Sequence, residues 1–176
     1  MAGGRPQPKE YGEWYAGYVE AVKATDALSA LQEASDALDK AMGDLGDMPG
    51  SFTYAEGKWT HAQLLQHLID AEWIFSVRAL RTARGDQTPM PGYNENDYAS
   101  EPVTVDVATL LNTLQHLRSS TMALFGTFTG EVFTRTGTAD WQQVSVRALA
   151  FIIAGHQLHH LKVWYERYFS LFRKIS

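Results

Sequence analysis

The chain has 176 residues, enough for one domain with a sizeable core, and its 45% hydrophobic and 12% aromatic content is typical of a globular protein. The formal charge of −5 argues against a nucleic-acid partner, because such proteins concentrate Lys and Arg on one face. The longest uncharged apolar run, residues 148–154, is too short to cross a bilayer, so we expect no membrane partner. Because the chain has no cysteine, any metal must be held by His and carboxylates.

The N-terminal segment contains two Pro and two Gly and lacks the apolar stretch of a secretory signal. We therefore expect a disordered leader over residues 1–10 and a cytoplasmic location. Residues 11–176 are expected to form a single domain.

Helical periodicity dominates the first half of that domain. Aromatic and apolar residues recur at helical spacing over residues 11–22, and a second apolar series from Leu28 to Leu45 steps by three and four, as in the seam of a bundle. Whether the chain kinks or starts a new helix at Thr25-Asp26 stays open. Thr60 and Gln63 then fit a capping box, which predicts the second long helical segment over about 60–84.

The second half contains two further helical patterns. Residues 85–103 hold three prolines and predict a long connection, which in a compact domain is usually functional or mobile. A helix over about 104–126 should follow, then an irregular Thr/Gly-rich stretch over 127–143 and a last helix from about Ser145. These segments predict an all-α protein, an antiparallel four-helix bundle, in which the long connections 46–59 and 85–103 allow a topology other than simple up-and-down.

Three histidines give the best indication of function. His67 lies on the apolar stripe of the 60–84 helix, and His156 and His160, four residues apart, share the apolar side of the last helix. Three imidazoles on one side of a metal suit zinc, nickel, copper or iron and leave positions open for water or substrate. Two alternatives stay open: core histidines satisfied by backbone carbonyls, and His159 in place of His160, since it also neighbours His156.

Other polar residues near these histidines have competing interpretations. Asp70, three residues after His67, could orient a ligand ring, act as a catalytic base, or be a solvated carboxylate. Glu72 should turn away, and His61, in the first turn of its helix, should be exposed or take part in the cap. An exposed face, or pairing with acidic residues, is expected for three arginines, Arg78, Arg81 and Arg84.

Two familiar metal-helix chemistries are disfavoured by missing residues. A zincin protease needs His-Glu-x-x-His, and Gln157 stands where the general base should be. Di-iron bundles need Glu-x-x-His pairs, and the sequence contains none.

With these residues laid out, the sequence resembles the DinB-like superfamily, four-helix metalloenzymes that include YfiT-type proteins and thiol-dependent transferases. The resemblance covers most of the chain, residues 11–168. It depends on the order and spacing of four short segments: Gly57–Thr60, His67–Glu72, Asp97–Ala99 and Gly155–His160.

The resemblance implies a divalent metal, often zinc or nickel, held by His67, His156 and His160. It also implies a homodimer. Some members are similar to S-transferases or isomerases that use a low-molecular-weight thiol, and a dication with three neutral ligands lowers the pKa of a bound thiol or water.

Our first hypothesis is therefore a metal-dependent enzyme, a thiol-dependent S-transferase or a hydrolase, that acts on a small molecule. In it, Asp70 assists the three histidines, and a loop over residues 93–98 covers the pocket. The alternative from another class is a non-catalytic metal-binding, ligand-binding or stress-related helical bundle. A third hypothesis, a plain interaction bundle with satisfied core histidines, predicts no metal.

Overall fold

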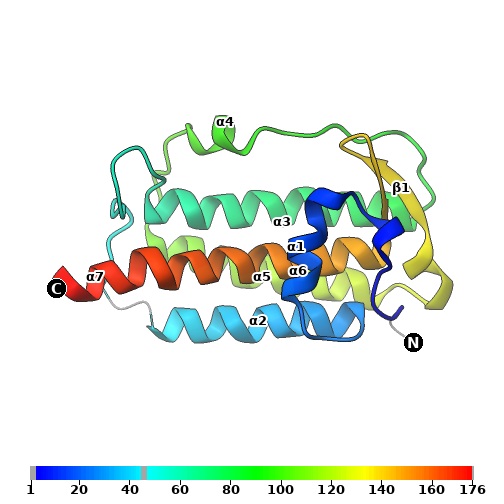
Figure 1. Ribbon diagram of the computed structural model, residues 1–176, viewed down its shortest axis with the longest axis horizontal. Helices are drawn as coiled ribbons and strands as arrows, with labels where there is room; N and C mark the ends of the chain where they lie inside the picture. The colour runs from blue at the N-terminus through cyan, green and yellow to red at the C-terminus, as the bar shows by residue number, and fades with distance from the viewer. Residues whose placement is uncertain (1–2, 45–46, 176) are drawn as a thin grey trace.

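The computed structural model describes residues 3–44 and 47–175, and four long helices of this part form a bundle (Figure 1). They are α2 (Ala27–Asp44), α3 (His61–Ala83), α5 (Val107–Gly126) and α6 (Val146–Val163). The four-helix bundle predicted from periodicity is confirmed. Leu45, the last position of the second apolar series, lies outside the described residues.

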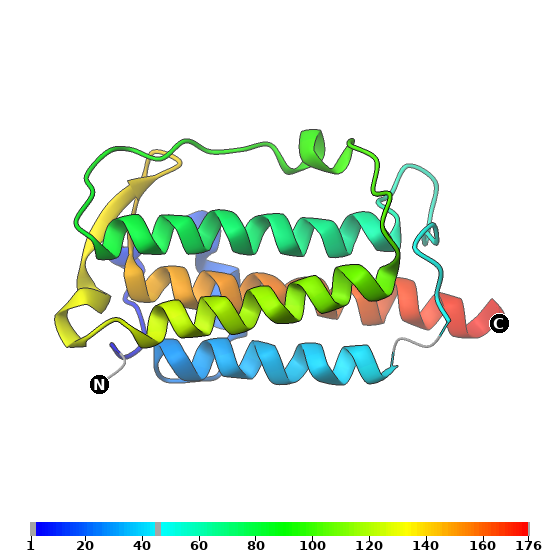
Figure 2. The same cartoon turned by 180° about the vertical axis from the view of Figure 1, so that it is seen from behind.

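The helices do not alternate simply up and down. α3 and α5 run in one direction along the bundle, and α2 and α6 run in the other, as both views show (Figure 2). α6 packs between α2 and α3, while α5 packs against the other sides of the same two helices. Because α3 and α5 are parallel, the chain between them has to return along the whole length of the bundle.

Side-chain caps set the start of the long helices. The capping box predicted at Thr60 and Gln63 is present. The backbone N–H of Gln63 donates to Thr60 Oγ1 (3.2 Å), and the backbone N–H of Thr60 donates to Gln63 Oε1 (2.7 Å). Asp106 and Ser145 cap α5 and α6 in the same way, through the backbone N–H three residues on. α5 therefore begins at Val107, three residues later than predicted.

The long connection returns along α3 as an extended strap, here defined as residues 85–103 (Figure 1). It contains the short helix α4 (Glu95–Ala99). Two side chains of α3 hold it: Arg78 Nη2 donates to the carbonyl oxygen of Pro91 (2.8 Å), and Gln63 Nε2 donates to that of the last α4 residue (2.7 Å). Backbone hydrogen bonds at Met90 tie it to strand β1 (Thr136–Ala139) as well. The path of the strap is therefore fixed at several points.

The stretch 127–143, predicted as irregular, contains regular structure. A short 3₁₀ turn, Gly130–Thr134, precedes an antiparallel hairpin of β1 (Thr136–Ala139) and β2 (Gln142–Ser145). The two tip residues, Asp140 and Trp141, have positive φ values of 49° and 61°. Tight hairpin turns favour Asn-Gly or Asp-Gly there, so this Asp-Trp pair carried no hairpin signal.

The disordered leader expected over residues 1–10 is wrong for the residues that the structure describes. Pro8–Glu10 forms a 3₁₀ turn, and the guanidinium of Arg5 donates to backbone carbonyls at the end of α1 (Ala16–Ala21). The Glu10 carboxylate pairs with Arg147 of α6. Because buried polar contacts hold this segment, its Pro and Gly content was misleading.

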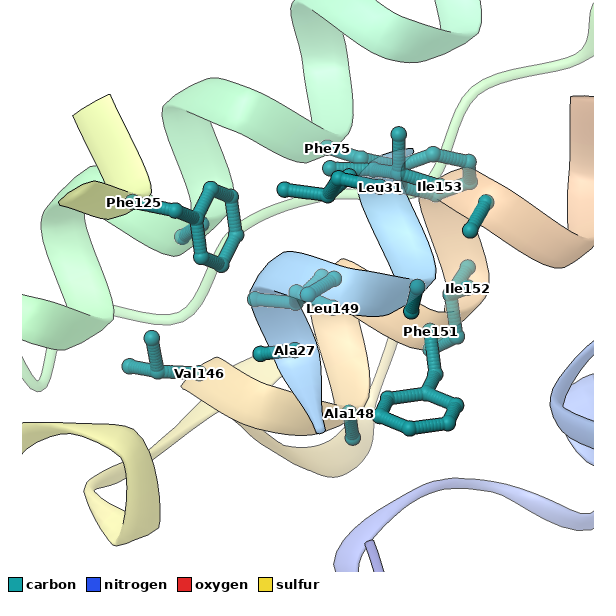
Figure 3. Packing of buried hydrophobic residues seen from close by; sticks show 14 of the residues in the cluster. Ala27, Leu31, Phe75, Phe125, Val146, Ala148, Leu149, Phe151, Ile152 and Ile153 are labelled. Atoms are coloured by element: carbon teal, nitrogen blue, oxygen red, sulfur yellow. The ribbon is translucent and has the colours of Figure 1, made fainter. Parts of the chain in front are cut away.

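The main core surrounds the first half of α6. Side chains of all four long helices meet there, among them Leu31, Phe75, Phe125 and Leu149 (Figure 3). Every residue of 148–157 is buried, because the bundle packs on one side of α6 and α1 packs on the other. In the described part of the chain, no helix combines the length and the apolar character needed to span a membrane.

Candidate metal centre

The three predicted histidines meet in the bundle interior. His67 of α3 faces His156 and His160 of α6, and one nitrogen from each ring lies within 4.8 Å of the other two. His67 Nε2 and His156 Nε2 are only 2.9 Å apart. His159 is exposed and lies outside this group, so the geometry selects His160 from the two alternatives.

Burial keeps these imidazoles neutral. Burial, the largest cause, and the neighbouring His67 and His159 together lower the pKa of His160 to about 3. The pKa of His156 falls well below its ordinary value for the same reasons, burial first. Burial also lowers the pKa of His67, although the nearby Glu95 and Asp70 oppose the effect. Near pH 7 each ring therefore offers a lone pair, the form in which histidine binds a metal.

A divalent metal fits this donor set. His160 Nδ1 is buried and has no hydrogen-bond partner among the described residues. Two neutral ring nitrogens at 2.9 Å and a third within 4.8 Å can converge on one cation. Because the cluster contains no carboxylate and no thiolate, an ion held there would keep its full positive charge.

The histidines line a cavity of about 280 Å³. Its wall is largely aromatic, with Trp14, Tyr15, Tyr18, Trp59, Phe75 and Tyr93. Three charged residues complete it: Arg78, Glu95 and Asp140. The strap supplies Gly92, Tyr93 and Glu95, so part of the 93–98 segment that we predicted to cover the pocket lines it.

Gly155 brings α1 against the histidines. A Cβ atom at this position would lie 1.9 Å from the carbonyl oxygen of Tyr18, so only glycine permits this helix crossing. The crossing places the Tyr18 ring 5.3 Å from the His156 ring and 5.5 Å from the His159 ring. The aromatic wall of the cavity thus depends on one small residue beside a histidine.

Asp70, the predicted catalytic residue, does not line the cavity. It is half-buried, and its carboxylate accepts a hydrogen bond from Gln66 Nε2 (2.8 Å). The carboxylates that do line the cavity are Glu95 and Asp140, and Glu95 opposes the pKa shift of His67 more strongly than Asp70 does. A role for Asp70 stays a prediction, while Glu95 is a stronger candidate within the loop that the sequence analysis indicated.

Glu72 and Gln157, near the ligands in sequence, face a different part of the interior. Contrary to expectation, Glu72 is buried, and it pairs with Arg118 of α5 through two hydrogen bonds (2.9 and 2.8 Å). Arg118 also donates to Gln157 and to the carbonyl oxygen of Leu31, and Gln157 donates to that of Ala34. Gln157 therefore belongs to a polar network that joins all four long helices.

Two other expectations about polar residues were wrong. His61 is fully buried beside the Trp164 ring rather than exposed, and burial lowers its pKa to about 4. Arg78 is also buried and lines the cavity, whereas Arg81 pairs with Asp86 (2.7 Å) as expected. Burial of His61 and Arg78 depends on the segments before α3 and on the strap, which helical periodicity does not place.

Known proteins resemble this chain in sequence and in fold. The family model of the DinB superfamily matches residues 30–163. A relative from Oceanobacillus iheyensis, named "putative metal-dependent hydrolase", is 26% identical over 125 residues, which cover 69% of this chain and 72% of the relative.

Among solved structures, the chain is similar to YfiT from Bacillus subtilis, described as "a probable metal-dependent hydrolase with an unusual four-helix bundle topology". The match has a TM-score of 0.68 and 21% identity, and it covers 93% of this chain and 91% of the other. At this identity the likeness establishes the shared fold alone.

Proposed function

The chain belongs to the DinB superfamily, and from this premise we propose that it hydrolyses small molecules with a divalent metal held by His67, His156 and His160. The observation that carries the proposal is the convergence of three neutral imidazoles within 4.8 Å at an open cavity of about 280 Å³. The names of the two relatives, both called metal-dependent hydrolases, support the same reaction class.

The chain supplies ligands, a proton acceptor and a binding wall. When bound, a divalent ion with three neutral ligands supplies Lewis acidity, which acidifies a water molecule. The base of a zincin helix is replaced by Gln157, which is bonded to Arg118 in the bundle interior, so the proton acceptor must come from another element. Glu95 lines the cavity and acts on the pKa of His67, which makes it the best-placed acceptor for a proton from water.

The aromatic wall gives the cavity its binding capacity. Tyr18, Phe75 and Trp59 contact the histidine rings directly, at ring distances of 5.3, 5.9 and 4.9 Å. Such a wall binds an apolar part of a substrate beside the histidine cluster. Zinc or nickel, a thiol cosubstrate with transferase activity, a homodimer and a cytoplasmic location stay predictions from the sequence.

Metal content of untagged protein, measured by mass spectrometry, is the first test. We expect about one metal per chain, lost in His156→Ala and kept in His159→Ala, which is the matched control on the same helix. Absence of metal from the native protein, even after incubation with zinc or nickel, would exclude the proposal. With metal bound, Glu95→Gln should lower kcat for ester or amide substrates and leave the metal content unchanged. An unchanged kcat would show that another group accepts the proton from water.

A further inference from the structure

One buried arginine of the cavity forms no direct ion pair among the described residues. Arg78 is only 4% exposed, yet among the described residues no carboxylate forms an ion pair with it. Its guanidinium donates to the carbonyl oxygen of Pro91 and lies 5.6 Å from the centre of the Phe75 ring. Arg118, the other buried arginine of the described chain, is paired with Glu72 at 2.8 Å. The chain thus forms a direct ion pair with the buried arginine of its core but not with the one in its cavity.

A buried cation without a counter-ion is costly, and a guanidinium has five N–H donors. One carbonyl, the Tyr15 hydroxyl and one aromatic face satisfy only part of that capacity. The planar fork of donors matches a carboxylate through two parallel hydrogen bonds. The remaining donors of Arg78 can therefore bind an anionic group of a ligand.

Arg78 and the histidine cluster lie at separate positions of the same cavity. Both Arg78 and His67 are on α3, with Arg78 three turns further along the helix. Phe75 separates them, with its ring 5.9 Å from the His156 ring and 5.6 Å from the Arg78 guanidinium carbon. A ligand that touches both positions must therefore span the Phe75 ring.

We propose that Arg78 binds a carboxylate of the substrate, so that the substrates are small molecules whose carboxylate lies several bonds from the bond that is hydrolysed. The inference rests on the proposed function, which defines the reacting position at the histidines. Glu95 and Asp140 line the same cavity and repel a doubly charged group, which favours a carboxylate over a phosphate. Arg78 is in this sense a specificity-determining residue.

The test uses inhibitors that bind a metal at one end. Zinc-loaded protein is titrated calorimetrically with monohydroxamates of dicarboxylic acids of increasing length, each compared with the matching terminal amide. At the length that spans Phe75 we expect the carboxylate to bind about tenfold or more tightly than the amide, as for a charge-assisted hydrogen bond. Arg78→Gln should abolish the difference. Arg81→Gln, one turn away and paired with Asp86 outside this cavity, should retain it.

A second arm does not depend on metal. Metal-free protein at pH 8 is titrated with 3-phenylpropionate and 3-phenylpropionamide, with tryptophan fluorescence as the signal, since Trp14 and Trp59 line the cavity. The acid should bind more tightly than the amide, and Arg78→Gln should remove the preference. If Arg78→Gln does not fold, Arg78→Lys serves instead and should retain only part of the preference, because lysine keeps the charge but not the fork.

The outcomes separate the two proposals. Equal binding of acid and amide to the native protein, or a preference that persists in Arg78→Gln, overturns the role of Arg78. Failure of every hydroxamate to bind zinc-loaded protein overturns the metal-dependent function, and the phenylpropionate arm then decides the role of Arg78 by itself.

Discussion

Gly155→Ala should test the helix crossing that forms the aromatic wall. Glycine inside a helix normally costs about 1 kcal/mol relative to alanine, so the substitution would stabilise an unobstructed helix. Here the new Cβ would lie 1.9 Å from the Tyr18 carbonyl oxygen and 2.5 Å from its carbonyl carbon. Both are backbone atoms, which cannot rotate away as a side chain can. The clash therefore decides the sign of the effect.

Relief of that clash requires α1 to withdraw from α6 by at least about 1 Å, which loosens the packing of the buried Val19 as well as Tyr18. Overpacking of this kind costs about 1–3 kcal/mol, and against backbone atoms we expect the upper part of that range. After the gain in helix preference, the net loss in the free energy of unfolding should be about 1–2 kcal/mol.

Urea unfolding followed by circular dichroism measures this loss. Gly17→Ala is the matched control, because Gly17 lies on α1 and a Cβ atom added there would meet nothing within 4 Å. It should leave stability unchanged or raise it by up to about 1 kcal/mol. If Gly155→Ala proves as stable as Gly17→Ala, the crossing of α1 over α6 at this residue is wrong.

Three further substitutions probe the interior and the hairpin. Glu72→Leu should destabilise the protein by about 3–5 kcal/mol in urea unfolding, because Arg118 is left buried without a counter-ion, and adding Arg118→Met should recover much of that loss. The pKa of His61, about 4 in the folded protein against 6.5 ordinarily, means that the unfolded chain binds its proton first as the pH falls. Through this residue, the free energy of unfolding of the metal-free protein should fall by up to about 3 kcal/mol between pH 6.5 and pH 4. His61→Leu should remove that part of the pH dependence, whereas His116→Ala, at an exposed histidine, should leave it unchanged. Trp141→Gly should raise the melting temperature, because it relieves a positive φ of 61° at a residue that is 83% exposed, and a lower melting temperature would show that the indole makes a stabilising contact.

Local patterns in the sequence were enough to predict the long helices and the histidine cluster. The capping box at Thr60 and the four-residue spacing of His156 and His160 depend only on helix geometry, which fixes neighbours within one turn. The apolar stripe of the same helix favours His160 over His159, and the structure places His160 in the cluster. The capping box and the pair on α6 need no knowledge of how the helices are arranged, whereas the meeting of that pair with His67 of α3 does.

The features that sequence could not predict depend on distant segments. Glu72 is buried because Arg118, 46 residues later, supplies its counter-ion. Glu95 reaches the cavity because the strap returns along α3, and helical periodicity says nothing about the path of a connection. The hairpin was missed because Asp140 and Trp141 adopt positive φ without the glycine that usually marks such a turn.

The position of Arg118 has a consequence for the folding pathway. Its donors are satisfied by α2, α3 and α6 together, through Leu31, Glu72 and Gln157. A bundle of three helices that contains α5 but lacks α2, α3 or α6 leaves the guanidinium beside apolar side chains with an incomplete set of acceptors, which raises the free energy of these intermediates. The long helices should therefore assemble in one cooperative transition, with single-exponential kinetics and a linear chevron plot.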